Sequence, residues 1–108
     1  MSLIQSKLEA EKWLAKRLTQ EGPGLWTDRE REDLAAKLAQ DYRPQGAAWR
    51  VKEWTQQPEG IPVQVVTRGG DFGIHTINEP GKGREKAREK AGAIMRSLNA
   101  LDAEMRET

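Results

Sequence analysis

The chain has 108 residues, of which 18 are basic and 17 acidic, and it contains no cysteine. Its formal net charge of +1 argues against a partner that attracts the whole molecule electrostatically. Without cysteine the chain forms no disulfides and no thiolate metal sites, and it has no cysteine nucleophile.

The apolar content predicts one folded domain, residues 1–108, with a thin core. Leu, Ile, Val and Phe together supply 19 residues. That share is close to the level at which disorder becomes a concern, but disorder also requires a high net charge. Four tryptophans add apolar area. A core this small leaves apolar surface uncovered, and self-association is one way to cover it.

The sequence gives no sign of a membrane or export segment. No apolar run approaches the roughly 18 residues of a membrane span. The opening residues, "MSLIQSKLEAEKW", lack the apolar segment of a signal peptide. We therefore expect a cytoplasmic protein without a membrane partner, and the small size and composition favour a bacterial source.

Two helices are predicted first, over residues 3–21 and 28–42. At about 100° per residue, Trp13 projects from the charged face of the first helix, opposite an apolar stripe of Leu3, Ile4, Leu8, Leu14, Ala15 and Leu18. The second helix begins with Thr27 and Glu30 at the spacing of a capping box. Pro44 ends it. The short "GPG" link between the helices predicts an antiparallel helical hairpin.

A β-region is predicted over residues 47–78, with a hairpin over 61–78. If Gly69 and Gly70 are the central turn residues, Val65 faces Ile74, and a four-residue loop from Gly69 to Phe72 keeps the same faces. In this register Val63 also faces Thr76 and His75 lies opposite Gln64, so one face carries Val63, Val65, Phe72 and Ile74. Residues 47–56 fit a strand or a helix, and two tryptophans, a valine and a threonine favour a third strand.

The longest helix is predicted over residues 83–106. Its apolar residues are spaced alternately four and three apart, as in an a/d seam, at Ala87, Ala91, Ile94, Leu98, Leu101 and Met105. The alanines would let the helix lie close to a sheet, while the larger residues meet another surface. The fold class is therefore α+β: an N-terminal helical hairpin, a small antiparallel sheet and a long C-terminal helix packed on it. Open sheet edges and this seam suggest a homodimer.

The sequence predicts no catalytic, cofactor or metal site. His75 is the sole histidine, and a general base needs an orienting partner and a nucleophile beside it. Its expected neighbour is Gln64, and no serine lies near it in the sequence. One histidine without cysteine leaves only carboxylates for a metal, and those at the start of the second helix suit the helix dipole. The glycine motif "PGKGR" departs from the Walker pattern.

A basic helix start supports an alternative function in nucleic-acid binding. The segment "GKGREKAREKA" carries a local excess of positive charge before and within the last helix. With the order helix, three strands, helix, it resembles the double-stranded-RNA-binding domain over about 60 to 80 residues. The resemblance implies phosphate contacts from Lys82, Arg84, Lys86 and Arg88. The loop "QQPEGIP" departs from that family, because it lacks the expected Gly-Pro and histidine.

The favoured function is a non-enzymatic protein–protein interaction module. Tryptophan is enriched at interface hot spots, and core packing explains Trp13 and Trp26 least well. With the large residues of the last helix, the predicted partner-binding set is Trp13, Trp26, Leu98, Leu101 and Met105. We expect a homodimeric regulator or adaptor that masks or bridges another protein, such as a transcription factor.

Overall fold

The computed structural model describes residues 4, 6–46, 48–53, 61–70, 72–79 and 84–106. Along the chain these form α1 (Lys7–Glu21), α2 (Asp28–Asp41), β1 (Trp49–Glu53), β2 (Ile61–Thr67), β3 (Gly73–Glu79) and α3 (Arg84–Arg106). The strands form one antiparallel sheet in the order β1-β2-β3. The fold is therefore α+β, and residues 49–53 form the third strand that the sequence favoured.

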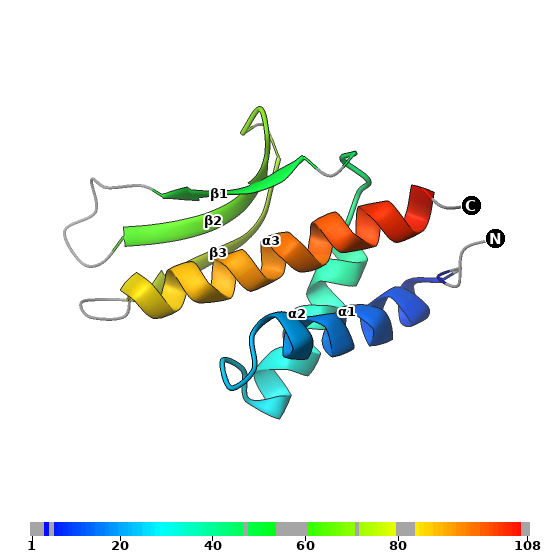
Figure 1. Cartoon of the computed structure of the whole chain (residues 1–108), viewed down its shortest axis with the longest axis horizontal. Coiled ribbons are helices and arrows are strands. Elements are labelled where there is room, and N and C mark those ends of the chain that lie inside the picture. Colours follow the sequence, from blue (N-terminus) through cyan, green and yellow to red (C-terminus); the bar gives the residue numbers. More distant parts are fainter. Residues whose placement is uncertain are drawn as a thin grey trace.

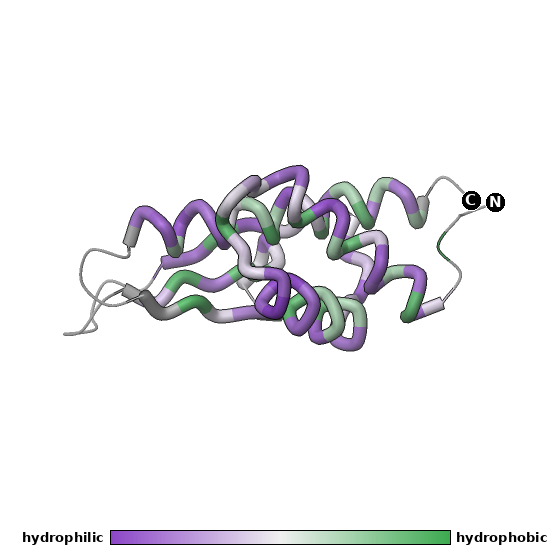
Figure 2. The backbone as a smooth tube through the Cα atoms, turned by 90° about the horizontal axis from the view of Figure 1, so that it is seen from below, coloured by the Kyte–Doolittle hydropathy of each residue, from purple (hydrophilic) through white to green (hydrophobic). Residues whose placement is uncertain are grey.

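The long helix α3 lies between the sheet and the N-terminal helix pair (Figure 1). It packs on all three strands and also on α1, while α1 packs along α2. Figure 2 shows hydrophilic and hydrophobic residues alternating along the helices. Because α3 has neighbours on two sides, more of it is buried than one seam would require. Within the described part of the chain, no helix is long and apolar enough to cross a membrane.

Helix α1 starts at Lys7, later than predicted, because Ser6 caps it. The Ser6 hydroxyl accepts a hydrogen bond from the Glu9 N–H at 3.1 Å. The buried stripe consists of Ala10, Leu14 and Leu18. The predicted stripe was partly wrong: the Leu8 side chain is 59% exposed, because it points to a different side of the helix.

Helix α2 begins as the sequence predicted. The Thr27 hydroxyl accepts from the Glu30 N–H at 3.1 Å, and the Glu30 carboxylate accepts from the Thr27 N–H at 3.3 Å. The capping box is therefore confirmed. The helix ends at Asp41, before Pro44, and buries Leu34, Ala35, Leu38 and Ala39.

The β2–β3 turn differs from the predicted two-residue turn. The Thr67 N–H donates to the Phe72 carbonyl and the Gly70 N–H donates to the Thr67 carbonyl, both at 2.9 Å. The turn is therefore closed by Thr67 and Phe72, and it is longer than the two residues Gly69 and Gly70. Of the two adjacent glycines only Gly70 has a positive φ, +75°, so Gly69 does not need to be glycine for its backbone conformation.

A β-bulge at Ile74 corrects the predicted register. Val66 pairs with Gly73 as predicted, but Val65 then pairs with His75 and not with Ile74. Val63 likewise pairs with Ile77 and not with Thr76. The extra residue shifts the alternation, so His75 shares the helix-facing side of the sheet with Val65. The predicted register, which placed His75 opposite Gln64 and off the apolar face, was therefore wrong.

The apolar seam of α3 is buried inside this chain. Its first five members are 0% exposed: Ala87, Ala91, Ile94, Leu98 and Leu101. The second surface that the larger residues meet includes α1. On α3, Asn99 also pairs with the backbone of Trp49 in the edge strand β1, donating to its carbonyl at 3.2 Å and accepting from its N–H at 3.1 Å. The seam is thus accounted for without a second copy.

Candidate functional site

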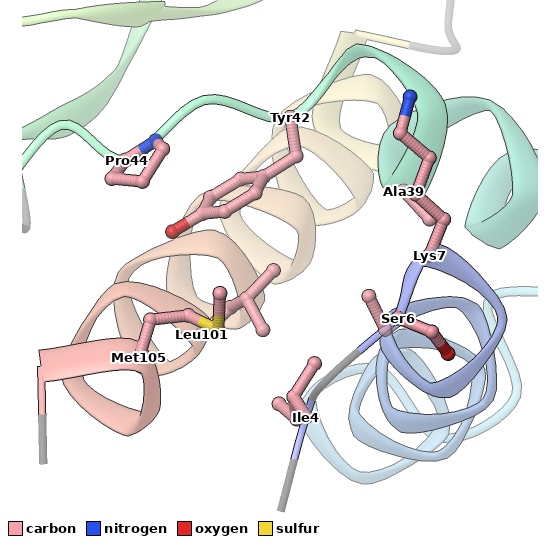
Figure 3. Close-up of a pocket in the computed structure, with 9 residues that line it drawn as sticks. Ile4, Ser6, Lys7, Ala39, Tyr42, Pro44, Leu101 and Met105 are labelled. Atoms are coloured by element: carbon pink, nitrogen blue, oxygen red, sulfur yellow. The ribbon is translucent and has the colours of Figure 1, made fainter. Parts of the chain in front are cut away.

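An apolar groove of about 310 Å³ opens where the start of α1 meets the end of α3 (Figure 3). The end of α2 and the segment that follows it complete the walls. We call this site the apolar groove; its lining residues are Ile4, Ser6, Lys7, Ala10, Ala39, Tyr42, Pro44, Leu101 and Met105. Most of this lining is hydrocarbon, as in sites that bind apolar groups.

Tyr42 forms one wall of the apolar groove and is held by a buried carboxylate. Its hydroxyl donates a hydrogen bond to Asp102 of α3. Asp102 is 1% exposed and also accepts from the Gln45 N–H at 3.2 Å. A charge so deeply buried requires such donors. The pair therefore fixes the Tyr42 ring beside Leu101 and Met105, as Figure 3 shows.

The opposite side of the apolar groove comes from the first residues of α1. In Figure 3, Ile4, Ser6 and Lys7 lie across the groove from Tyr42 and Met105. The Lys7 ammonium donates to the Gln40 carbonyl at 3.3 Å, which joins α1 to the end of α2. Among the described lining residues, Lys7 is the only charged one.

His75 lines a second pocket, of about 280 Å³, with residues from α2 and from the turn before it. We call it the histidine pocket; its lining residues are Trp26, Glu30, Asp33, Leu34, Lys37 and His75. Burial lowers the pKa of His75 below its ordinary value of 6.5, and the nearby charges of Lys37 and Lys90 lower it further. The imidazole is therefore neutral at pH 7. Its buried Nδ1 has no hydrogen-bond partner among the described residues.

An ion pair forms beside the histidine pocket. The Lys90 ammonium of α3 lies 3.0 Å from the Glu30 carboxylate and 5.4 Å from the centre of the Trp26 ring. The hydrogen bond from Lys90, together with the one from the Thr27 backbone, lowers the pKa of Glu30. Glu30 thus both caps α2 and pairs with α3.

The histidine pocket lacks the parts of a nucleophilic site. Its described lining contains no serine, threonine or cysteine. Across the described ranges no three histidine, aspartate or glutamate side chains are grouped so that they could hold a metal ion. What the pocket presents is a neutral imidazole, an indole ring, two carboxylates and one ammonium group.

The structure brings together only some of the predicted partner-binding residues. Leu101 and Met105 both line the apolar groove, and Met105 remains partly exposed. Leu98 is fully buried in the core. Trp26 lies in the histidine pocket. Trp13 and Trp26 are both partly buried against the core, so core packing explains them better than the sequence indicated.

The sequence reasoning missed Ser6, Lys7 and Asp102 at the apolar groove. Tyr42 is the last residue of the second helix that the sequence predicts, and its link to Asp102 leaves no signal in the sequence. The two residues lie 60 positions apart. A carboxylate between Leu101 and Met105 is ordinary for a helix that faces solvent on one side.

The basic helix start is partly engaged within the chain. Lys82 lies outside the described residues, and for Arg84 only the backbone is described. Lys86 is exposed. Arg88 pairs with Glu53 of β1, with Nη2 donating to Oε2 at 3.2 Å and Nε also donating to the same carboxylate. Glu53 therefore competes with any phosphate for Arg88.

No protein-family model, curated protein or solved structure matches the chain. Fold and site together define its class, a small α+β protein with an apolar groove where the start of α1 meets the end of α3.

Proposed function

We propose that the protein is a non-enzymatic binding module whose partner protein inserts an apolar side chain into the apolar groove. The observation that carries the proposal is the open concavity walled by Tyr42, Leu101 and Met105. Tyrosine and methionine are both enriched at protein interfaces. Methionine also adapts its flexible chain to the shape of a partner. Bound in this way, the protein would act as a regulator or adaptor.

The surroundings of His75 favour binding over catalysis. A general base is normally oriented through its second ring nitrogen by a hydrogen-bond partner. Nδ1 of His75 is buried, and no described residue provides that partner. The described lining of the histidine pocket also provides no nucleophile.

The pairing of Arg88 favours a protein partner over nucleic acid. Binding to a phosphate backbone gains its free energy from cations that neutralise phosphates. Arg88 already has a carboxylate partner in Glu53, and Lys90 has one in Glu30. A nucleic acid at this helix start would have to displace Glu53.

Self-association is not needed for the proposed docking. The apolar seam that favoured a homodimer is covered by the chain's own sheet and α1. A homodimer therefore remains a separate proposal, which sedimentation or light scattering over a range of protein concentrations would decide.

Site-specific photo-cross-linking in the source cells tests the docking site. A benzophenone amino acid replaces Pro44, which is exposed at the rim of the apolar groove, or Pro23, which is exposed beyond the far end of α1. We expect a discrete adduct with another protein from position 44 and not from position 23. Filling the groove with Ala39→Leu should remove that adduct while the fold, checked by circular dichroism, is retained.

Any one of three results would overturn the docking proposal. The first is an equal yield of the same adducts from both positions. The second is that position 44 gives only adducts with another copy of this chain, or gives none. An adduct that survives Ala39→Leu in a folded protein would also place the contact elsewhere.

A further inference from the structure

We infer that the apolar groove selects a partner segment in which one bulky apolar side chain lies next to a carboxylate. This inference rests on the docking role proposed above and adds the chemistry of the partner. It is carried by the size of the groove, by its lining and by the charge at its rim.

The size of the apolar groove limits the occupant to about one side chain. Its volume of about 310 Å³ is at the lower end of the range for ligand pockets. A whole helix or strand does not fit into such a space, but a large apolar side chain does. The occupant is therefore a short segment that anchors through one residue.

Two neighbouring residues on one side of the apolar groove, Tyr42 and Met105, differ in stiffness. Tyr42 is fixed by its hydrogen bond to the buried Asp102. Met105, on the last turn of α3, is unbranched and partly exposed. A rigid aromatic ring beside an adaptable side chain accommodates flat and branched apolar side chains and does not demand one fixed shape.

The charge at the rim of the apolar groove is positive. Lys7 is exposed, and it is the one charged residue among the described lining residues. Ser6 and Lys7 also stand at the start of α1, where the helix dipole favours negative charge. The carboxylate of Asp102 does not contact a ligand in the groove, because it is buried and accepts hydrogen bonds from the Tyr42 hydroxyl and the Gln45 N–H.

A neighbouring hollow, which shares Lys7 and Tyr42 with the apolar groove, carries one charge of each sign besides Lys7. These two charges belong to Asp41 and Arg43. Arg43 also lies over the Phe72 ring, 4.8 Å from its centre. A partner segment whose apolar residue occupies the apolar groove would therefore meet Lys7 first. A carboxylate beside that residue is complementary to it.

Two peptides that differ only in this charge provide the test. The probes are acetyl-Ala-Trp-Glu-Ala-amide and acetyl-Ala-Trp-Gln-Ala-amide, each titrated into the ¹⁵N-labelled full chain at pH 7 and low salt. We expect changes in amide chemical shift that are confined to groove residues. The acidic peptide should bind about two- to fivefold more tightly, as expected for one exposed charge near a helix start. Added salt should reduce this preference.

Lys7→Gln should abolish the preference, while the matched control Lys12→Gln, on an exposed part of the same helix, should keep it. Equal binding of both peptides in the groove would overturn this inference and leave the docking role standing. If neither peptide shifts the groove residues, both proposals fail. A preference for the acidic peptide that persists in Lys7→Gln would also overturn this inference. Chemical-shift changes at groove residues that appear when only the protein concentration is raised would overturn it too, because they would identify a second copy of the chain as the occupant.

Discussion

The Tyr42 hydroxyl donates a hydrogen bond to the Asp102 carboxylate, and this bond joins the end of α2 to the last turns of α3. Gln45 donates to the other oxygen of the same carboxylate. A buried charge of this kind stabilises the fold only while its donors remain. The wall of the apolar groove therefore depends on a polar contact in an otherwise apolar region.

Replacing Asp102 should destabilise the protein more than the small size of the aspartate side chain suggests. Asp102→Ala leaves the Tyr42 hydroxyl and the Gln45 N–H without their acceptor, and we expect a loss of about 2–3 kcal/mol in the free energy of unfolding. Urea denaturation followed by tryptophan fluorescence measures it. Asp41→Ala, an exposed carboxylate one residue before Tyr42, should change the stability by less than about 0.5 kcal/mol. Equal effects of the two variants would contradict the assigned role.

Local signals in the sequence predicted much of the fold. The capping box at Thr27 and Glu30 places the start of α2 correctly, because both partners lie within one helical turn. The seam of α3 is buried as its spacing indicated, because periodicity reports which face is covered. It does not report what covers the face, and here the cover comes from the same chain.

Features that depend on distant contacts could not be predicted in this way. The bulge at Ile74 is not signalled by alternation, since Val65–Ile74 and Val65–His75 pairings both place apolar residues on the core side. The wall of the apolar groove depends on Tyr42 meeting Asp102, 60 positions away. The burial of Lys90 against Glu30 likewise depends on α2, whose first turn is 60 positions away in the sequence.

The two adjacent glycines of the β2–β3 turn should respond differently to substitution. Gly70 has φ of +75°, where an added Cβ costs roughly 1–2 kcal/mol. Gly69 does not have a positive φ. We therefore expect Gly70→Ala to lower the thermal midpoint and Gly69→Ala to leave it nearly unchanged or raise it slightly.

The neighbours of Gly70 do not add a clash to this conformational cost. A Cβ there would lie 3.6 Å from the Arg50 guanidinium and 3.7 Å from the Lys52 ammonium, ordinary contact distances. Gly70→Asn should accordingly cost less than Gly70→Ala, since asparagine tolerates this backbone region better. Equal midpoints for the Gly69→Ala and Gly70→Ala variants would show that the turn is not as described.

In the Lys90–Glu30 pair, removing the glutamate should destabilise the protein more than removing the lysine. The Lys90 side chain is 8% exposed and that of Glu30 is 45% exposed. Glu30→Ala leaves a buried ammonium without this partner and removes half of the capping box, and we expect a loss of about 1–2 kcal/mol. Lys90→Met keeps the apolar stem and leaves a carboxylate that water can reach, so its cost should be under about 1 kcal/mol. Urea denaturation of both variants measures the two losses in the free energy of unfolding. A larger loss in Lys90→Met than in Glu30→Ala would contradict this prediction.

Stability should fall in mild acid because of His75. Its pKa in the folded protein lies below the ordinary value of 6.5, so the unfolded chain takes up the proton first. As the pH falls from about 7.5 through 6.5 toward the lowered pKa, the unfolded state binds more protons and the free energy of unfolding decreases. The folded state resists protonation because the imidazole is buried and faces Lys37 and Lys90.

Urea midpoints at pH 7.5 and pH 5.5 measure this loss of stability in mild acid. The His75→Gln variant should lose less stability between the two pH values than the wild type. Glu30 does not interfere, because its pKa is lowered from 4.5 and its contribution is lost only in stronger acid. As the sole histidine, His75 can also be titrated directly by its imidazole proton resonances. A midpoint that falls as steeply in His75→Gln as in the wild type, or a His75 pKa at or above 6.5, would contradict the buried, helix-facing position that the bulge at Ile74 creates.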